Sequence, residues 1–282
     1  MIAITGATGH LGQRVIEKLL ATHNAQDLVA IVRNPAKAQA LTDKGVQVRE
    51  AEYNNPAALA SALQGVEKLL LISSSEVGQR AVQHRNVIEA AKSAGVQLIA
   101  YTSLLHADTS PLGLRLEHRE TENDLARSGI PFVLLRNGWY SENYLASVPA
   151  ALEHGAFIGS AGEGKIASAS REDYAEAAAK VLSLDNQAGK VYELAGDNAW
   201  TLTELTEKIS ALTGKTVAYH NLSEADFAAA LQGAGLSEEF ARLLADSDVG
   251  ASKGGLFDDS RQLSQLIGRP TTSIDDSLKA IL

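Results

Sequence analysis

A glycine-rich segment near the start of the chain has the residue types and spacing of a phosphate-binding loop. It comprises Gly6, Ala7, Thr8, Gly9, His10, Leu11 and Gly12. Gly6 permits a tight turn, Gly9 lets backbone N–H groups approach a pyrophosphate, and Gly12 permits close packing of a helix on a strand. The positive end of the helix that follows would stabilise the same anion. We predict that this segment binds a dinucleotide; the alternative is a glycine-rich turn without a ligand.

The preferred cofactor is predicted from the residue that follows the second expected strand. Arg33 stands there, whereas an NAD-specific protein usually has an Asp or Glu that accepts a hydrogen bond from the ribose 2′-hydroxyl. A guanidinium offers a planar fork of donors that suits a 2′-phosphate, and Lys37 could add charge one turn later. NADPH is therefore favoured and NADH stays open as a second cofactor. The alternative is that Arg33 is an ordinary exposed arginine.

A second group of polar and aromatic residues follows a later expected strand. It consists of Asn137, Gly138, Trp139, Tyr140, Ser141, Glu142, Asn143 and Tyr144. The segment mixes flat apolar faces with hydrogen-bonding groups and leaves the carboxyl end of a strand, where α/β sheets place their ligands. We predict a substrate site in which Tyr140 and Asn143 position the substrate, with no residue certain to be catalytic. The alternative is a structured loop whose Trp139 and Tyr140 belong to the buried core.

The expected elements place both groups on a parallel sheet. Apolar, β-branched runs predict strands over residues 2–5, 28–32, 46–49, 68–72, 98–102, 132–135 and 191–194. The segments between them are mostly long enough for crossover helices. The predicted fold is α/β, a doubly wound and mostly parallel Rossmann sheet with a smaller C-terminal substrate lobe. We expect a dinucleotide-binding domain over residues 1–144, which also receives elements from about residues 165–200, and a lobe over residues 145–282.

Composition bears on partners and location. The 282 residues are 45% hydrophobic and 21% charged, carry a formal charge of −9 and include no cysteine. The acidic balance argues against a nucleic-acid partner, and no apolar run predicts membrane insertion. No metal site is predicted, because the histidines do not share ligand spacing. We expect a cytoplasmic protein without a signal peptide, and homo-oligomer formation is left open.

One catalytic signature is missing. In short-chain dehydrogenases, the fifth strand ends in a serine and the helix after it carries a Tyr-x-x-x-Lys motif. The corresponding residues 112–125 contain neither Tyr nor Lys. Tyr101 is expected to pack inside its strand. The charged residues Glu117, Arg119, Glu120 and Glu122 are expected to form a solvated helix face. Alcohol and ketone chemistry that depends on a phenolic acid is therefore not expected.

Four segments together resemble the NmrA-like branch of the atypical short-chain dehydrogenases. They are residues 5–12, 32–35, 52–56 and 134–144, and the last is similar to bacterial NAD(P)H:quinone oxidoreductases of type 2. The resemblance implies that Gly6 to Leu11 and Arg33 bind the cofactor phosphates. It also implies that Ser73, Ser74 and Ser75 contact the ribose on the nicotinamide side, and that residues 137–143 line the substrate side. Isoflavone-reductase-like relatives carry a lysine where His118 is the nearest match, so a lysine-based mechanism is in doubt.

Two functions are compatible with these features. The first is an NADPH-dependent reductase that transfers hydride to a quinone, which needs orientation but no strong acid. The second is a non-catalytic NADP(H)-sensing regulator of the NmrA type. A sugar-nucleotide epimerase is disfavoured by the missing tyrosine and lysine. The segment 137–144 favours the reductase.

Overall fold

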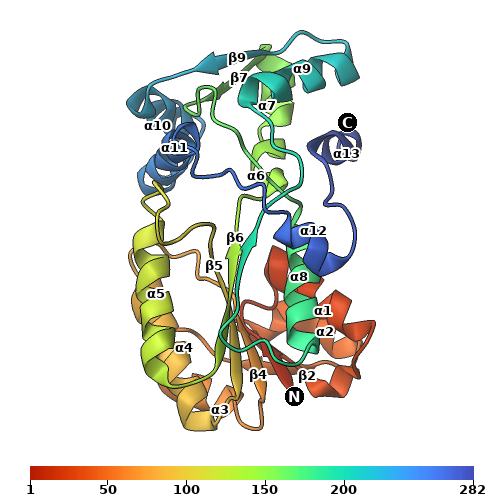
Figure 1. The fold of residues 1–282 in the computed structure, drawn as a ribbon, viewed down its shortest axis with the longest axis vertical. Helices are drawn as coiled ribbons and strands as arrows, with labels where there is room; N and C mark the ends of the chain where they lie inside the picture. The colour runs from red at the N-terminus through yellow and green to blue at the C-terminus, as the bar shows by residue number, and fades with distance from the viewer. The chain divides into compact units, whose positions relative to one another are not determined.

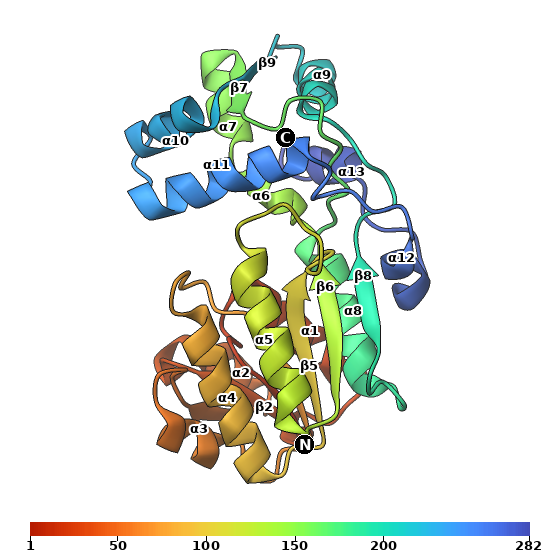
Figure 2. The ribbon, with the colours of Figure 1, turned by 60° about the vertical axis from the view of Figure 1, so that its left-hand side comes forward.

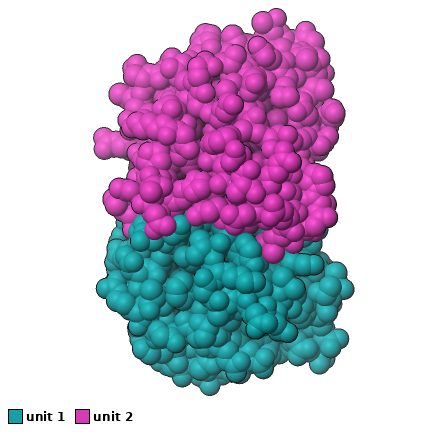
Figure 3. Space-filling view, in the orientation of Figure 1, with its two compact units in different colours: residues 1–104, 117–136, 171–192 teal, residues 105–116, 137–170, 193–282 magenta.

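The computed structural model describes residues 1–282, which divide into two compact units (Figure 3). Unit 1 comprises residues 1–104, 117–136 and 171–192. Unit 2 comprises residues 105–116, 137–170 and 193–282. None of the helices combines the length and apolar character that crossing a membrane requires.

A seven-stranded sheet, built mainly from unit 1, has the order β3-β2-β1-β4-β5-β6-β8 (Figure 1). Its strands are β1 (Ile2–Ile4), β2 (Leu28–Val32), β3 (Gln47–Glu50), β4 (Lys68–Leu71), β5 (Leu98–Leu104), β6 (Phe132–Asn137) and β8 (Val191–Leu194). The pairs from β3 through β5 are parallel, and Ala3 of β1 lies opposite Val29 of β2 and Leu69 of β4. The chain order reverses at β1, which makes its carboxyl end the expected ligand position. The predicted doubly wound Rossmann sheet is confirmed.

Helices cover both faces of this sheet (Figures 1 and 2). One face carries α3 (Pro56–Ala62), α4 (Arg80–Ala94) and α5 (Arg115–Ser128), and the other carries α1 (His10–Leu20) and α8 (Arg171–Ser183). The short helix α2 (Gln39–Asp43) lies between β2 and β3 in the chain. Because both faces are covered, the central strands β1, β2 and β4 are nearly continuous apolar runs rather than alternating ones.

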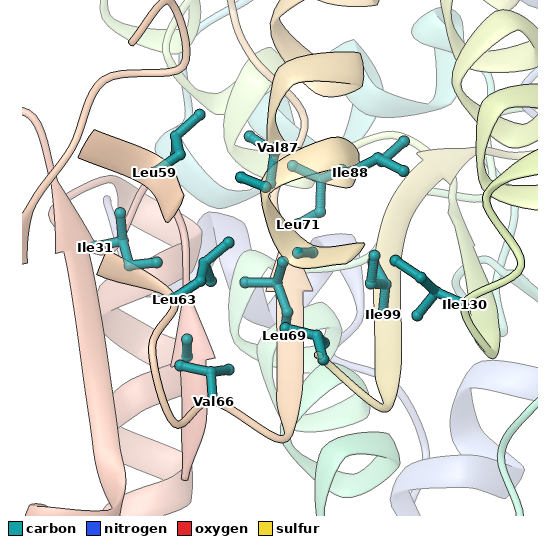
Figure 4. Close-up of a cluster of buried hydrophobic side chains, with 14 of the residues drawn as sticks. Ile31, Leu59, Leu63, Val66, Leu69, Leu71, Val87, Ile88, Ile99 and Ile130 are labelled. Atoms are coloured by element: carbon teal, nitrogen blue, oxygen red, sulfur yellow. The ribbon is translucent and has the colours of Figure 1, made fainter. Parts of the chain in front are cut away.

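The core of unit 1 lies between the sheet and the α3–α4 side (Figure 4). Leu59 of α3 and Val87 of α4 pack over Ile31, Leu69 and Leu71 of the strands, and all five side chains are at most 1% exposed. This packing makes the strand ends rigid supports for the loops that follow them.

The predicted strands differ from the observed ones mainly at their ends. The first strand ends at Ile4 instead of Thr5, whereas β5 and β6 each continue two residues further than predicted. A separate parallel pair in unit 2, β7 (Ala156–Gly159) and β9 (Ala218–Asn221), was not predicted. Both strands have only four residues, and β9 has no buried residue and no apolar run.

The rest of unit 2 is helical. It contains α6 (Ser141–Leu145), α7 (Val148–His154), α9 (Leu202–Thr213), α10 (Glu224–Gly233), α11 (Glu238–Ser252), α12 (Gln262–Ile267) and α13 (Ile274–Lys279). Thr201 and Glu204 form a capping box at the start of α9, as their spacing predicts.

Candidate functional site

The glycine-rich loop, residues 6–12, connects β1 to α1 in unit 1. Gly6 has a φ of +57°, a left-handed conformation that favours glycine, and the Gly9 N–H donates to the Gly6 carbonyl at 2.9 Å. A Cβ at Gly12 would lie 2.4 Å from the Gly6 carbonyl oxygen and 2.8 Å from the Ala7 Cα. The first glycine therefore makes the turn, and the third lets α1 pack against the loop.

The N-terminus of α1 suits an anion. Gly9 caps the helix without a side-chain hydrogen bond, and the first turn contains no acidic residue. The first N–H groups of α1 therefore meet no side-chain acceptor at the cap, and no carboxylate in the turn neutralises the positive end of the helix. These features fit the pyrophosphate of a dinucleotide.

The other predicted residues of the loop differ in exposure. Ala7 and Leu11 are buried, Thr8 is half-buried and His10 is exposed. Only the backbone of the two buried residues is free to face a ligand, because their side chains belong to the core.

Tyr53 ties the end of β1 to the end of β4. Its hydroxyl lies 2.6 Å from Thr5 Oγ1 and donates to the Ile72 carbonyl at 2.8 Å, while the Ile72 N–H donates to Thr5 Oγ1 at 3.0 Å. Burial raises the pKa of Tyr53, so the phenol stays protonated. This contact gives a structural reason for the 52–56 turn, in which Asn55 also caps α3.

Arg33 lies where the sequence places it, directly after β2, and its side chain is 71% exposed. Its Nη1 donates to Glu76 Oε1 at 3.0 Å. Glu76 follows β4, and β2 and β4 pair with β1 on its two sides. The ion pair therefore spans the carboxyl end of β1, where the glycine-rich loop begins. Sequence reasoning missed Glu76, because nothing in the pattern relates it to Arg33.

The serine loop, residues 73–75, is held by its backbone. The Ser73 N–H donates to Thr102 Oγ1 at 2.8 Å, and the Ser74 N–H donates to His84 Nε2 at 2.9 Å. Ser74 is buried, Ser73 is half-buried and Ser75 is exposed. The loop follows β4 on the ligand side of the sheet, as the predicted contact with a ribose requires.

His84 is a neutral structural residue beneath this loop. Its Nε2 accepts the Ser74 N–H, so its Nδ1 carries the proton and donates to Thr121 Oγ1 at 2.9 Å. Burial, together with the charge of the nearby Arg80, lowers the pKa of His84 to about 3.

His118 is also buried. Its Nδ1 lies 2.7 Å from the Tyr101 hydroxyl, which comes from β5. Burial lowers the pKa of His118 well below its usual value, and the charge of Arg80 acts in the same direction. Tyr101 packs inside its strand as predicted, and burial raises its pKa. Neither member of this pair is charged near neutral pH.

The expectation of a solvated face on α5 holds for Glu120, whose side chain is 48% exposed, but is wrong for Glu117 and Glu122. Glu122 is only 4% exposed and accepts from Ser103 Oγ at 2.6 Å and from Arg136 Nη2 at 2.8 Å. Glu117 pairs with the buried Arg80. Glu122 thus packs against β5 and β6, and Glu117 against α4; a charge pattern in one helix cannot reveal buried partners on other elements.

In unit 2, segment 137–144 leaves β6 and enters α6. The Gly138 N–H donates to the Leu194 carbonyl at 2.8 Å, and the Ser141 N–H donates to the Ala169 carbonyl at 2.9 Å. Trp139, Tyr140, Glu142 and Asn143 are half-buried, whereas Asn137, Gly138, Ser141 and Tyr144 are buried. The two aromatic residues Trp139 and Tyr140 are thus not fully enclosed in the core.

Two buried polar atoms of this segment have no hydrogen-bond partner. They are Asn137 Oδ1 and the Tyr144 hydroxyl. Such atoms are rare in folded proteins, and they suit a site that binds a ligand. The Tyr144 ring stands edge-on to Trp200, with centroids 5.0 Å apart. Burial raises the pKa of Tyr144, and the nearby Asp248 acts in the same direction.

Asp248 of α11 is a second group that sequence reasoning missed. Burial raises its pKa to about 6, although its Oδ2 accepts the Ser160 N–H at 2.8 Å. Its only sequence signal was an acidic residue within an alanine- and leucine-rich helix, which by itself predicts nothing.

Comparison with known proteins agrees with this geometry. A family model described as NAD(P)H-binding matches residues 6–185, which include the glycine-rich loop, Arg33 and the serine loop. The chain belongs to this NAD(P)H-binding family. Its match covers most of unit 1.

Relatives of this NAD(P)H-binding protein include characterised reductases. Quinone oxidoreductase 2 of Escherichia coli K12 is 71% identical over 278 residues, 99% of this chain and 97% of the relative. The crystal structure of Escherichia coli NADPH-dependent quinone oxidoreductase complexed with NADPH matches with a TM-score of 0.98 and 70% identity, covering 100% of this chain and 99% of that one. Citrobacter sp. triphenylmethane reductase complexed with NADP(H) matches with a TM-score of 0.96 and 38% identity, covering 100% of both chains.

Proposed function

We propose that this protein is an NADPH-dependent quinone oxidoreductase that reduces a quinone by two electrons to the hydroquinone. The observation that carries the proposal is the 71% identity, along nearly the whole chain, to a quinone oxidoreductase. The glycine-rich loop and Arg33 supply the matching chemistry in unit 1. The regulatory alternative is less well supported, because the high-identity relative is an enzyme.

The residues of unit 1 fit the cofactor. The N-terminus of α1 and the backbone around Gly9 would hold the pyrophosphate, and Arg33 would hold the 2′-phosphate. Ser73, Ser74 and Ser75 would contact the ribose on the nicotinamide side. When bound, NADPH supplies a hydride, which together with one proton converts a quinone to its hydroquinone.

Segment 137–144 would bind the acceptor. Tyr140 and Asn143 would orient the flat ring, and the unpartnered Tyr144 hydroxyl is a donor suited to a quinone oxygen. No strong acid is needed, because water can protonate the hydroquinone oxygens. The depressed pKa of His118 agrees with this scheme, since a neutral imidazole is a poor proton donor.

We also infer action in the cytoplasm, since the sequence contains no cysteine. Whether the chain forms a homo-oligomer does not enter the proposed chemistry.

The test is a steady-state assay against a panel of benzoquinones and naphthoquinones. NADPH oxidation is followed by absorbance, and NADPH binding without acceptor is measured by calorimetry. We expect saturable, quinone-dependent oxidation that is faster with NADPH than with NADH. Tight NADPH binding without turnover on any quinone of the panel would instead establish the sensor function.

A further inference from the structure

Glu76 stands opposite Arg33 at the carboxyl end of β1. Its Oε1 accepts from Arg33 Nη1 at 3.0 Å, and its Oε2 accepts from Gln83 Nε2 at 2.7 Å. We propose that Glu76 is a specificity-determining residue: it competes with the 2′-phosphate of NADPH for Arg33, and thereby limits the preference for NADPH over NADH. The inference rests on the role given to Arg33 in the proposed function.

Hydrogen bonds to the serine loop and to α4 hold Glu76 in place. The Glu76 N–H donates to Ser74 Oγ at 3.1 Å, and the Ser74 carbonyl accepts from Arg80 Nε at 2.8 Å. His84 accepts the Ser74 N–H. Arg80, Gln83 and His84 are buried residues of the first turns of α4, so the loop that carries Glu76 is built on a rigid helix.

Gln83 is a buried side chain whose hydrogen bond fixes the position of the Glu76 carboxylate. The side chain is 2% exposed, its Nε2 is bound to Glu76, and its Oε1 is buried without a hydrogen-bond partner. A buried amide with one unsatisfied end costs free energy, which the charge-assisted bond to Glu76 offsets. Gln83 binds Oε2 and leaves Oε1 to Arg33, so the bond to Gln83 holds the carboxylate beside the guanidinium.

The two cofactors respond differently to this ion pair. The 2′-phosphate of NADPH would bind the Arg33 guanidinium, to which the Glu76 carboxylate is already bound. The 2′-hydroxyl of NADH is neutral and makes no such demand on Arg33. The side chains of the pair are 71% and 44% exposed, so the competition is modest in size.

The decisive variant is Glu76→Gln. The amide keeps the shape of the side chain and an oxygen that accepts from Gln83, so the loop should keep its structure. Calorimetry at low salt should show the Kd of NADPH falling about threefold to tenfold, or about 0.7–1.4 kcal/mol at 1.4 kcal/mol per tenfold. The Kd of NADH should change by less than about twofold.

The matched control is Glu17→Gln. Glu17 forms an exposed ion pair with Lys44 in the same unit, at 3.5 Å, and the substitution changes the net charge by the same amount. It should leave the ratio of the two Kd values unchanged. An equal gain for NADPH in this control would reduce the Glu76 effect to net charge and overturn the inference.

A second arm repeats Glu76→Gln in an Arg33→Ala background. The gain in NADPH affinity should fall below about twofold there, because the guanidinium for which Glu76 and the 2′-phosphate compete is absent. Unchanged or weaker NADPH binding in the single variant, or a full gain in the Arg33→Ala background, would overturn the inference. Failure of the unmodified protein to bind NADPH would instead contradict the proposed function.

Discussion

Arg33 is the residue on which the choice of cofactor depends. It is the first residue after β2, and its guanidinium faces the ligand end of the sheet beside Glu76. Arg33→Asp should weaken NADPH binding by roughly 2–3 kcal/mol, because a charge-assisted hydrogen bond is lost and a repulsion is gained. NADH binding should change much less. Equal losses for the two cofactors in calorimetry would mean that Arg33 does not bind the 2′-phosphate.

His118 is the residue on which the proposed lack of a general acid can be tested. Since burial keeps the pKa of His118 well below 6.5, the imidazole is neutral throughout the range from about pH 6 to 8. His118→Ala should therefore lower kcat by less than about tenfold, whereas loss of a general acid typically costs roughly 10²–10⁴-fold. The pH profile of kcat should show no limb that disappears in the variant.

The exposed His154 of α7 provides a control for this experiment. His154→Ala should leave kcat unchanged. A collapse of turnover in His118→Ala with NADPH binding intact would show that an imidazole takes part in proton transfer after all.

At the scale of elements, two glycines at the junction of β1 and α1 have different roles, Gly9 in cofactor binding and Gly12 in packing. Gly9 has φ −77° and ψ 167°, which any residue can adopt, and a Cβ there would lie 3.1 Å from the Gly6 carbonyl oxygen. Gly9→Val should therefore leave a folded protein that no longer binds a dinucleotide, because the side chain blocks approach to the backbone.

Gly12→Val is the matched contrast. Its Cβ would lie 2.4 Å from a backbone oxygen, so α1 must move and the protein should lose at least about 1–3 kcal/mol of stability. Urea unfolding and NADPH calorimetry on both variants distinguish the two roles. Unchanged NADPH affinity in Gly9→Val would remove the evidence that this loop is the cofactor site.

The elements that sequence predicts well are those whose pattern is local. The apolar run of β2 fixes its bounds, β8 also has the predicted bounds, and the three glycines locate the start of α1. The partners of Glu122 and Glu76 could not be predicted, because Arg136 lies on β6 and Arg33 follows β2, and only the folded sheet brings them together. The strands β7 and β9 were missed because each has only four residues, and those of β9 are largely polar.

At the scale of the whole molecule, the predicted functional residues fall into two groups. The glycine-rich loop, Arg33 and the serine loop belong to unit 1, and segment 137–144 belongs to unit 2. Residue types, spacing and position indicated the glycine-rich loop, Arg33 and segment 137–144, whereas the serine loop was implied by the resemblance to NmrA-like proteins. The buried Tyr144 and Asp248 of unit 2 needed the structure, since their burial depends on helices far apart in the chain.

The central claim is that NADPH reduces a quinone by two electrons on this protein. The most direct measurement mixes the protein anaerobically with NADPH and a limiting amount of 1,4-benzoquinone, and follows NADPH absorbance together with the semiquinone signal by electron paramagnetic resonance. We predict that one NADPH is consumed for each quinone, with hydroquinone as product and no semiquinone above the level without protein. A transient semiquinone signal that grows with the amount of protein, or bound NADPH that is not consumed, would contradict the claim.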